Sequence, residues 1–360
     1  MTVGGCDPHR ETFTIAVVDA AGLEVVTGSW PSTPAGFDAG IELLVEHGVE
    51  RVGVEGSGSN GRHLAAALQL AGLDVREVPP RRSAQWRIAD HRAKTDRIDA
   101  LSVARLVAAD PTLGPAKVIL DPAFGELEVI HARRRALVDH IKRVQADADR
   151  LLCELPPAVT EHVAMTGNVR RRLKSLAQCE PHTTDRVTRA RLDWLESLTD
   201  QLAALDAEAK ALAARMTELL EEHGSTLTDI FGIGAVLAAE IVIRAGDPTR
   251  FESESAFARW NGTAPRAVSS GEGDSAPTKH RLDLGGCRAV NRALHIASVT
   301  QAGREQRAVE FLTRKRSEGK TAREARRAHK RRLSNLVIRR LWADHAARTQ
   351  PDHPQLALAA

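Results

Sequence analysis

The sequence predicts an α/β domain followed by an all-α region, and three observations support this fold class. Over roughly the first 110 residues, short runs rich in β-branched residues alternate with segments of helical spacing, which is typical of layered strands and helices. From Pro122 onward, apolar residues recur every three or four positions over much longer stretches. Hydrophobic residues make up 42% and charged residues 27% of the 360, which indicates a globular chain rather than a disordered one.

The N-terminal pattern predicts its elements in order. Residues 3–18 are expected to form two strands joined by a turn at Asp7-Pro8, and residues 25–30 a third strand that ends at Pro31. The spacing then predicts a helix over 37–46, a strand over 51–54, a helix over 62–71, a strand over 74–78 and a helix over 95–109. Strands separated by helices of this length imply some parallel pairing.

The middle of the chain is predicted to form long helices. The spacing of apolar residues between Leu127 and Leu151 is helical, and Leu155-Pro156-Pro157 breaks it. A heptad seam follows, consisting of Leu195, Leu198, Leu202, Leu205, Ala209, Leu212, Met216 and Leu219. This seam predicts a coiled coil, and it fits an antiparallel hairpin within one chain as well as a coil between two chains.

A glycine-rich turn follows that region. Residues 227–246 contain Gly232-Ile233-Gly234 between two apolar stretches, which predicts helix, tight turn, helix. The pattern resembles a helix-hairpin-helix, in which backbone N–H groups at a helix start bind DNA phosphates. A simple packing turn between two core helices explains the same residues.

Composition excludes several functional classes. The chain has no tyrosine, so tyrosine recombination is excluded, and aromatic residues at 3% offer few surfaces for stacking on single-stranded bases. No apolar run approaches the ~18 residues of a membrane span, and the N-terminus has no secretory signal pattern. The four cysteines lie far apart without a CxxC pair, which argues against a zinc knuckle or disulfide framework. We therefore expect a cytoplasmic protein without a membrane segment.

The cations are unevenly distributed along the chain. There are 50 lysines and arginines against 47 acids, and the arginines gather toward the C-terminus. A basic run on a helix is typical of phosphate contacts, although a solvated helix face has the same composition. The run consists of Arg314, Lys315, Arg316, Lys320, Arg323, Arg326, Arg327, Lys330, Arg331, Arg332, Arg339 and Arg340.

Four carboxylates stand out by their positions. Asp7 and Glu55 end predicted strands, while Asp96 and Asp99 stand three apart and therefore share one helix face. Taken singly, each acid fits a structural role in a turn or an ion pair. If they converge, they form a cluster of oxygen donors of the kind that Mg²⁺ or Mn²⁺ prefers, suited to phosphoryl transfer.

The N-terminal motifs resemble a known family. The stretches GGCDPHRETFTIAVVDAAG, RVGVEGSG and HRAKTDRIDALSVARL are similar to the DEDD transposase and Piv/MooV recombinase family of insertion sequences, and KTDRIDA is the most specific of these. The resemblance implies a RuvC-like N-terminal domain of the RNase H superfamily. It also implies that Asp7, Glu55, Asp96 and Asp99 are the catalytic, metal-binding tetrad.

A second block extends the resemblance to the C-terminal half. The stretch FARWNGTAPRAVSSGEGDSAPTKHRLDLGGCRAVNRALHIA resembles the family's serine transposase domain, which implies that Ser270, rather than its neighbour Ser269, is the nucleophile. Ser-Ser-Gly on its own is also an ordinary flexible loop. Basic residues after this loop and on the C-terminal helix are expected to contact nucleic acid: Lys279, Arg281, Arg288, Arg292, Arg314, Lys315, Lys320, Arg323 and Arg327.

The resemblance also implies a domain organisation. It divides the chain into a RuvC-like catalytic domain over 1–115, a coiled-coil region over 120–223, a transposase domain with the serine loop and basic helix over 224–348, and a tail over 349–360.

The expected function is metal-dependent cleavage and rejoining of DNA through a serine nucleophile. The resemblance implies Mg²⁺ or Mn²⁺ as cofactor and DNA as partner, both as element ends and as target. It further implies a guide RNA from the same element and a homo-oligomer, either dimer or tetramer, in which the acids of one protomer meet the serine of another. The alternative is a RuvC-like nuclease that hydrolyses branched DNA with water, for which Ser270 has no role.

Overall fold

The computed structural model describes residues 2–89, 95–116, 118, 120–179, 181–267, 280–282 and 286–349. The chain divides into two compact units. The first comprises Met1–Pro122 with Gly246–Glu252, and the second comprises Ala123–Ala245 with Ser253–Ala360.

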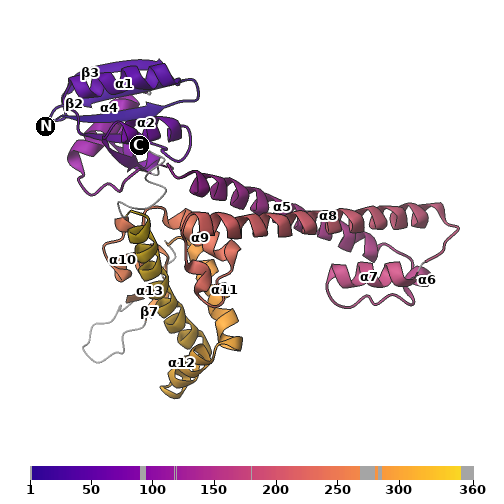
Figure 1. Ribbon diagram of the computed structural model, residues 1–360. Coiled ribbons are helices and arrows are strands. Elements are labelled where there is room, and N and C mark those ends of the chain that lie inside the picture. Colours follow the sequence, from indigo (N-terminus) through magenta and orange to yellow (C-terminus); the bar gives the residue numbers. More distant parts are fainter. Residues whose placement is uncertain are drawn as a thin grey trace. The chain divides into compact units, whose positions relative to one another are not determined.

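A five-stranded mixed sheet forms the centre of the first unit (Figure 1). Its strands are β1 (Val3–Pro8), β2 (Thr12–Val18), β3 (Glu24–Pro31), β4 (Arg51–Glu55) and β5 (Asp74–Val78). Their order is β3-β2-β1-β4-β5, with β1, β2 and β3 antiparallel to one another. β4 pairs in parallel with both β1 and β5, which confirms the predicted parallel pairing.

Helices cover both faces of the sheet. The helices of this unit are α1 (Pro34–Glu46), α2 (Arg62–Leu70), α3 (Pro80–Ala89) and α4 (Asp96–Ala109). Leu44 of α1 and Leu64 of α2 are buried in one core cluster with Phe13, Ile15 and their neighbours on the strands. The buried residues of α4 form the other cluster with strand residues of the opposite face. This two-sided cover explains why the central strands are buried along nearly their whole length.

Two glycines bring α4 unusually close to the sheet. Side chains alternate along a strand, so Gly5 of β1 and Gly53 of β4 both face α4. A Cβ added at Gly5 would lie 2.1 Å from the backbone N of Ala104 and 2.5 Å from the backbone O of Ala100. A Cβ added at Gly53 would lie 2.4 Å from a methyl carbon of Val107. The helix therefore packs against bare backbone at these points.

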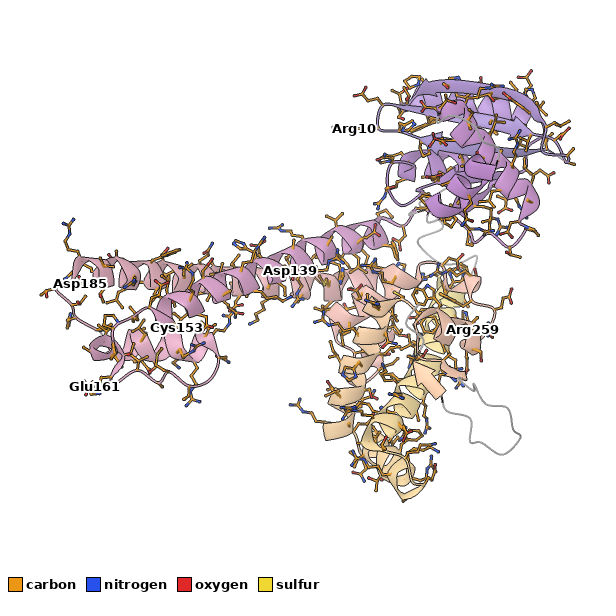
Figure 2. The ribbon with its side chains drawn as sticks, turned by 180° about the vertical axis from the view of Figure 1, so that it is seen from behind. Arg10, Asp139, Cys153, Glu161, Asp185 and Arg259 are labelled. Carbon is orange, nitrogen blue, oxygen red and sulfur yellow. The ribbon has the colours of Figure 1, made fainter. Side chains whose placement is uncertain are left out.

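Two long helices dominate the second unit, α5 (Pro122–Cys153) and α8 (Arg186–Glu222). Buried leucines of the predicted seam, including Leu195 and Leu198, pack in one cluster with residues of α5. The ion pairs between the helices run in opposite directions along the two sequences: Glu126 with Arg215, Arg133 with Glu208, and Glu154 with Arg191. The two helices thus form an antiparallel hairpin within the chain; in Figure 2, Cys153 marks the end of α5 and Asp185 precedes α8.

The remaining elements of the second unit are helices of different lengths and one small two-stranded sheet. At the far end of the long hairpin lie α6 (Pro157–Thr160) and α7 (Val169–Cys179). After α8 come the 3-10 turn η1 (Leu227–Asp229), α9 (Ala235–Ala245), α10 (Glu254–Trp260), the strands β6 (Pro265–Ala267) and β7 (His280–Leu282), α11 (Arg288–Arg304), α12 (Gln306–Ser317) and α13 (Ala322–Arg348). A further 3-10 turn, η2 (Pro248–Arg250), belongs to the first unit.

Over the first 110 residues the predicted elements agree closely with these bounds, but the turn expected at Asp7-Pro8 is wrong. Both residues lie inside β1, paired with Thr14 and Phe13, and the turn follows at residues 9–11. The sequence did not delimit the helices α3, α6, α7, α10, α11 and α12 or the strands β6 and β7. In α3 and α7 the apolar residues are sparse.

The segment 227–246 was predicted to form two helices joined by a tight turn. Its first element is instead a single 3-10 turn, and the glycine turn leads into α9. The residues of the heptad seam pack against α5 within the chain. A coiled coil between two chains stays a prediction, and so do the domain boundaries. Among the described helices, none has the length and apolar character needed to cross a lipid bilayer.

Replacing Gly5 by alanine is expected to destabilise the first unit by about 1–3 kcal/mol or more, because the added methyl meets rigid helix backbone. Hydrogen exchange of the β1 and β2 amides in the full chain measures this loss. Gly114→Ala is the matched control, since a Cβ there meets nothing within 4 Å. Equal protection of β1 in the two variants would contradict the close packing of α4.

Candidate active site

The strand alternation places two carboxylates on the α4 side of the sheet. Asp7 follows Gly5 by two residues on β1, and Glu55 follows Gly53 by two residues on β4, so each acid shares the face of its glycine. The parallel register pairs Cys6 with Val54, which brings the carboxyl ends of both strands to the same edge. Asp7 is only 8% exposed, whereas Glu55 is half-buried.

The first turn of α4 supplies the other two acids. Thr95 caps the helix, since its hydroxyl accepts from the N–H of Ile98, and Asp96 and Asp99 follow in the first turn. The backbone of α4 lies against Gly5 at Ala100 and Ala104, so the turn before Ala100 lies beside Asp7, the next residue of β1 on that face. Asp99 is 9% exposed and Asp96 is exposed.

The other three carboxylates all act electrostatically on Asp7. Burial raises the pKa of Asp7 to about 6, and the nearby negative charges of Asp99, Glu55 and Asp96 raise it as well, while His9 opposes the shift. The structure therefore brings the four predicted acids into one cluster, called here the acidic cluster. Such mutual repulsion is typical of a site that gains stability when a cation or a proton enters it.

Two buried atoms in this cluster have no hydrogen-bond partner among the described residues: Oδ2 of Asp7 and Nε2 of His9. Oδ2 of Asp7, Nε2 of His9 and Oδ1 of Asp96 nevertheless converge, with the potential ligand atoms of the three side chains all within 4.8 Å of one another. Buried oxygen and nitrogen atoms that lack hydrogen bonds and lie close together are suitable ligands for a divalent cation. The residues present thus suit the metal that the sequence predicts.

Two neighbours of the cluster were missed by sequence reasoning. His9 stands two residues after Asp7, and this i, i+2 spacing at a strand end was the available signal. Ser83 of α3 is buried, and its hydroxyl donates to Oε2 of Glu55 at 2.5 Å, which fixes that carboxylate. No motif marked Ser83, because the segment that carries it was not predicted as a helix.

A further acid lies beside the cluster. Glu77 of β5 is partly buried, burial raises its pKa, and the charge of Glu55 adds to the rise. The hydroxyl of Ser57 donates to Oε2 of Glu77. The register of β5 places Glu77 opposite Val54 and Val78 opposite Glu55, so Glu77 faces the α1–α2 side and not α4.

The predicted serine site falls outside the described residues. This holds for Ser270, for its neighbour Ser269 and for Lys279, and it also holds for the side chain of Arg281 in β7. Arg288 and Arg292 are exposed on the first two turns of α11. Their positions leave them accessible to nucleic acid, and their role stays a prediction.

The basic C-terminal run divides into two groups. Lys320, Arg323 and Arg327 are exposed around the start of α13, whereas Arg314 and Lys315 of α12 pair with Glu318. Four other cations of the run contact groups inside the unit. Lys330 is buried and donates to Asn291, Arg331 donates to Asn335, Arg339 pairs with Glu254, and Arg340 pairs with Asp229. Part of the basic run is therefore engaged by acids and polar groups of the same unit rather than being a uniformly solvated helix face.

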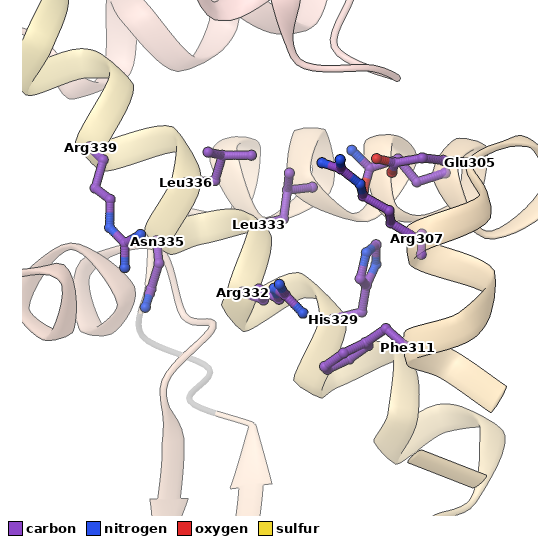
Figure 3. Close-up of a pocket in the computed structure, with 11 residues that line it drawn as sticks. Glu305, Arg307, Phe311, His329, Arg332, Leu333, Asn335, Leu336 and Arg339 are labelled. Carbon is purple, nitrogen blue, oxygen red and sulfur yellow. The ribbon is translucent and has the colours of Figure 1, made fainter. Parts of the chain in front are cut away.

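A cavity of about 440 Å³ opens between α11, α12 and α13 (Figure 3). Arg307, Arg332 and Arg339 line it together with Glu305, so cations outnumber acids there. Phe311 forms part of the wall, and the guanidinium of Arg332 lies 5.4 Å from the centre of its ring. An anionic group is the ligand that this lining favours.

Comparisons with known proteins agree with the motifs. A family model of IS110 transposases of the DEDD type, described as "Transposase", matches residues 4–157, and a second model, described as "Transposase IS116/IS110/IS902 family", matches residues 224–312. The "Insertion element IS110 uncharacterized 43.6 kDa protein" of Streptomyces coelicolor is 26% identical over 339 residues, which cover 81% of each chain.

Solved structures of RuvC from Thermus thermophilus are also similar to part of the chain. One is RuvC in complex with a Holliday junction substrate, at 18% identity, and another is a RuvC structure at 19% identity. Both matches have a TM-score of 0.27 and cover 32% of this chain and 99% of RuvC.

The raised pKa of Asp7 predicts a pH-dependent cost to the stability of the metal-free protein. The folded-state pKa of about 6 exceeds the ordinary value of 3.8, so the folded state holds the proton more tightly than the unfolded state does. Relative to Asp7→Asn, the free energy of unfolding of the wild type is expected to fall between about pH 4 and pH 6 and then to stay level. With allowance for screening by solvent, the loss is about 1–2 kcal/mol.

Urea denaturation in the presence of EDTA, followed through hydrogen exchange of the β1 and β2 amides, measures this difference. If the difference in the free energy of unfolding between Asp7→Asn and wild type is the same at pH 4 and pH 8, ionisation of Asp7 does not destabilise the folded state.

Proposed function

The chain belongs to the IS110 family of transposases, and from this we propose that it cuts and rejoins DNA strands at the acidic cluster, with a serine as nucleophile. The family consists of DNA transposases, enzymes that bind, cleave and rejoin DNA. The observation that carries the proposal is the convergence of Asp7, Glu55, Asp96 and Asp99 from two strand ends and one helix start.

The four carboxylates are proposed to hold Mg²⁺ or Mn²⁺. The carboxylate oxygens and the buried atoms without hydrogen bonds at Asp7 and His9 support this assignment. The hydrogen bond from Ser83 restrains the orientation of the Glu55 carboxylate. A bound divalent ion supplies positive charge that stabilises phosphate oxygens during strand cleavage. The acids of this chain then have one task, which is to hold that charge at a fixed place beside the DNA backbone.

The strand-cleaving step is proposed to use the hydroxyl of Ser270. Its oxygen attacks the phosphorus of the scissile phosphodiester, a serine–phosphate bond forms, and the bond to one deoxyribose oxygen breaks. The serine proton leaves to solvent and the departing DNA hydroxyl gains one, so the reaction is balanced without a further reagent. Because the new bond is also a phosphodiester, the reverse attack by a DNA hydroxyl rejoins a strand.

The partners are proposed on the same basis. Exposed arginines on α11 and α13 and the cationic cavity beside Phe311 suit contacts to phosphates, which give affinity without sequence choice. A guide RNA from the same element would supply sequence choice, and a homo-oligomer would let the serine domain of one protomer serve the acids of another. The cytoplasm is the proposed compartment, in keeping with four free thiols.

Asp96→Ala is expected to reduce strand cleavage and strand transfer at least about hundredfold, because it removes a carboxylate from the cluster. DNA binding, measured by fluorescence anisotropy, is expected to stay within about twofold of wild type. Asp38→Ala is the matched control, since Asp38 is an exposed acid on α1 of the same unit. Normal strand transfer by purified Asp96→Ala would refute the assignment of the acids.

Ser270→Ala is expected to abolish the covalent protein–DNA adduct that wild type forms during cleavage. The adduct is measured as a denaturation-resistant, labelled band on element DNA, with Ser269→Ala as the control that keeps it. Adducts that persist in Ser270→Ala and vanish in Ser269→Ala would move the nucleophile by one residue. Cleavage without any adduct in the wild type would favour hydrolysis by water, as in the nuclease alternative.

A further inference from the structure

His9 lies between two of the acids of the cluster. Its Nε2 is 3.3 Å from Oδ2 of Asp7 and 3.2 Å from Oδ1 of Asp96. We propose that His9 is a nitrogen ligand of the divalent ion in this site, and that it biases the site toward Mn²⁺ over Mg²⁺. This inference rests on the proposed function, in which the carboxylates hold such an ion.

The spacing of the three atoms suits a shared ion. An octahedral ion with ligands at about 2.1 Å holds neighbouring ligands about 3.0 Å apart and opposite ligands about 4.2 Å apart. The two observed separations from Nε2 are close to the first value, and no pair in the group exceeds 4.8 Å. Only small movements of the side chains are needed to bring all three atoms to a common centre.

A simple ion pair explains the contact less well. If His9 served only to neutralise the acids, its ring N–H would be expected to donate to one of them. Among the described residues, however, Nε2 of His9 and Oδ2 of Asp7 are buried and 3.3 Å apart, yet neither atom makes a hydrogen bond of good geometry. Asp7 as a whole is more than nine-tenths buried, so its unpartnered oxygen faces the cluster rather than solvent. A shared cation satisfies both atoms at once.

The backbone holds His9 at this place. Its N–H donates to the carbonyl of Thr12 at 2.8 Å, and the pairing of Pro8 with Phe13 closes the β1–β2 hairpin just before it. The backbone of His9 is therefore held by the hairpin, independently of the acids that its side chain contacts. A side chain on such a rigid connection is well placed to act as a ligand.

The ligand type decides the choice of ion. Mg²⁺ prefers oxygen ligands in a strict octahedron and keeps several of its waters. An imidazole nitrogen is a better ligand for first-row transition ions, whose affinity for nitrogen sites rises from Mn²⁺ onward. Carboxylates suit Mg²⁺ and Mn²⁺ alike, so His9 is the group in this set that separates the two ions.

Metal binding by the full chain tests the proposal without any activity assay. Mn²⁺ alone and Mg²⁺ alone are titrated by calorimetry into wild type, His9→Ala, His9→Asn and the control His63→Ala, an exposed histidine on α2. In His9→Ala the Mn²⁺ affinity is expected to fall about tenfold or more, while the Mg²⁺ affinity changes less than about threefold. His9→Asn, which offers an oxygen, is expected to shift the preference toward Mg²⁺. His63→Ala is expected to match wild type.

Pulsed electron paramagnetic resonance of the Mn²⁺-loaded protein provides the second readout. Wild type and His63→Ala are expected to show a nitrogen coupling to Mn²⁺ that His9→Ala lacks. Oxygen-only coordination in wild type, or an unchanged ratio of Mn²⁺ to Mg²⁺ affinity in His9→Ala, would overturn the role of His9 and leave the acidic site intact. If wild type binds neither ion and Asp96→Ala behaves identically, the proposed metal-dependent function fails as well.

Discussion

The close packing of α4 against the bare backbone of β1 and β4 is the constraint on which the site depends. Gly5 and Gly53 let the helix backbone reach the sheet, and each glycine precedes an acid of the cluster by two residues on the same face. The first turn of α4 can then meet both strand ends. With a larger residue at either glycine the helix would stand off, and Asp99 would move away from Asp7.

This packing forces like charges together. Asp7 is buried beside three other acids, and burial and repulsion both raise its pKa. The hydrophobic clusters on the two faces of the sheet and the ion pair of Arg97 with Glu24, which ties α4 to β3, stabilise the arrangement. The repulsion among these acids destabilises this edge of the sheet, and apolar burial elsewhere in the domain offsets that destabilisation.

Much of this could be predicted from the sequence, because strand alternation and helix spacing are local. The ends of β1 and β4 and the i, i+3 spacing on α4 drew attention to the four acids, and the family resemblance joined them into one predicted site. His9 was missed because it lies just past a strand end, and Ser83 because its helix has little amphipathic pattern. The partner of the heptad seam needed tertiary information, since leucines at such spacing pair equally well with α5 or with another chain.

Because α5 and α8 are antiparallel, the start of α5 and the end of α8 lie at the same end of the long hairpin. A seven-residue insertion in one helix, matched by seven in the other, would preserve the order of seam residues and extend the reach by about 10.5 Å. Length is therefore a separable property of this hairpin. Paired gain or loss of heptads would change the length of the hairpin while leaving the residues of the acidic cluster untouched.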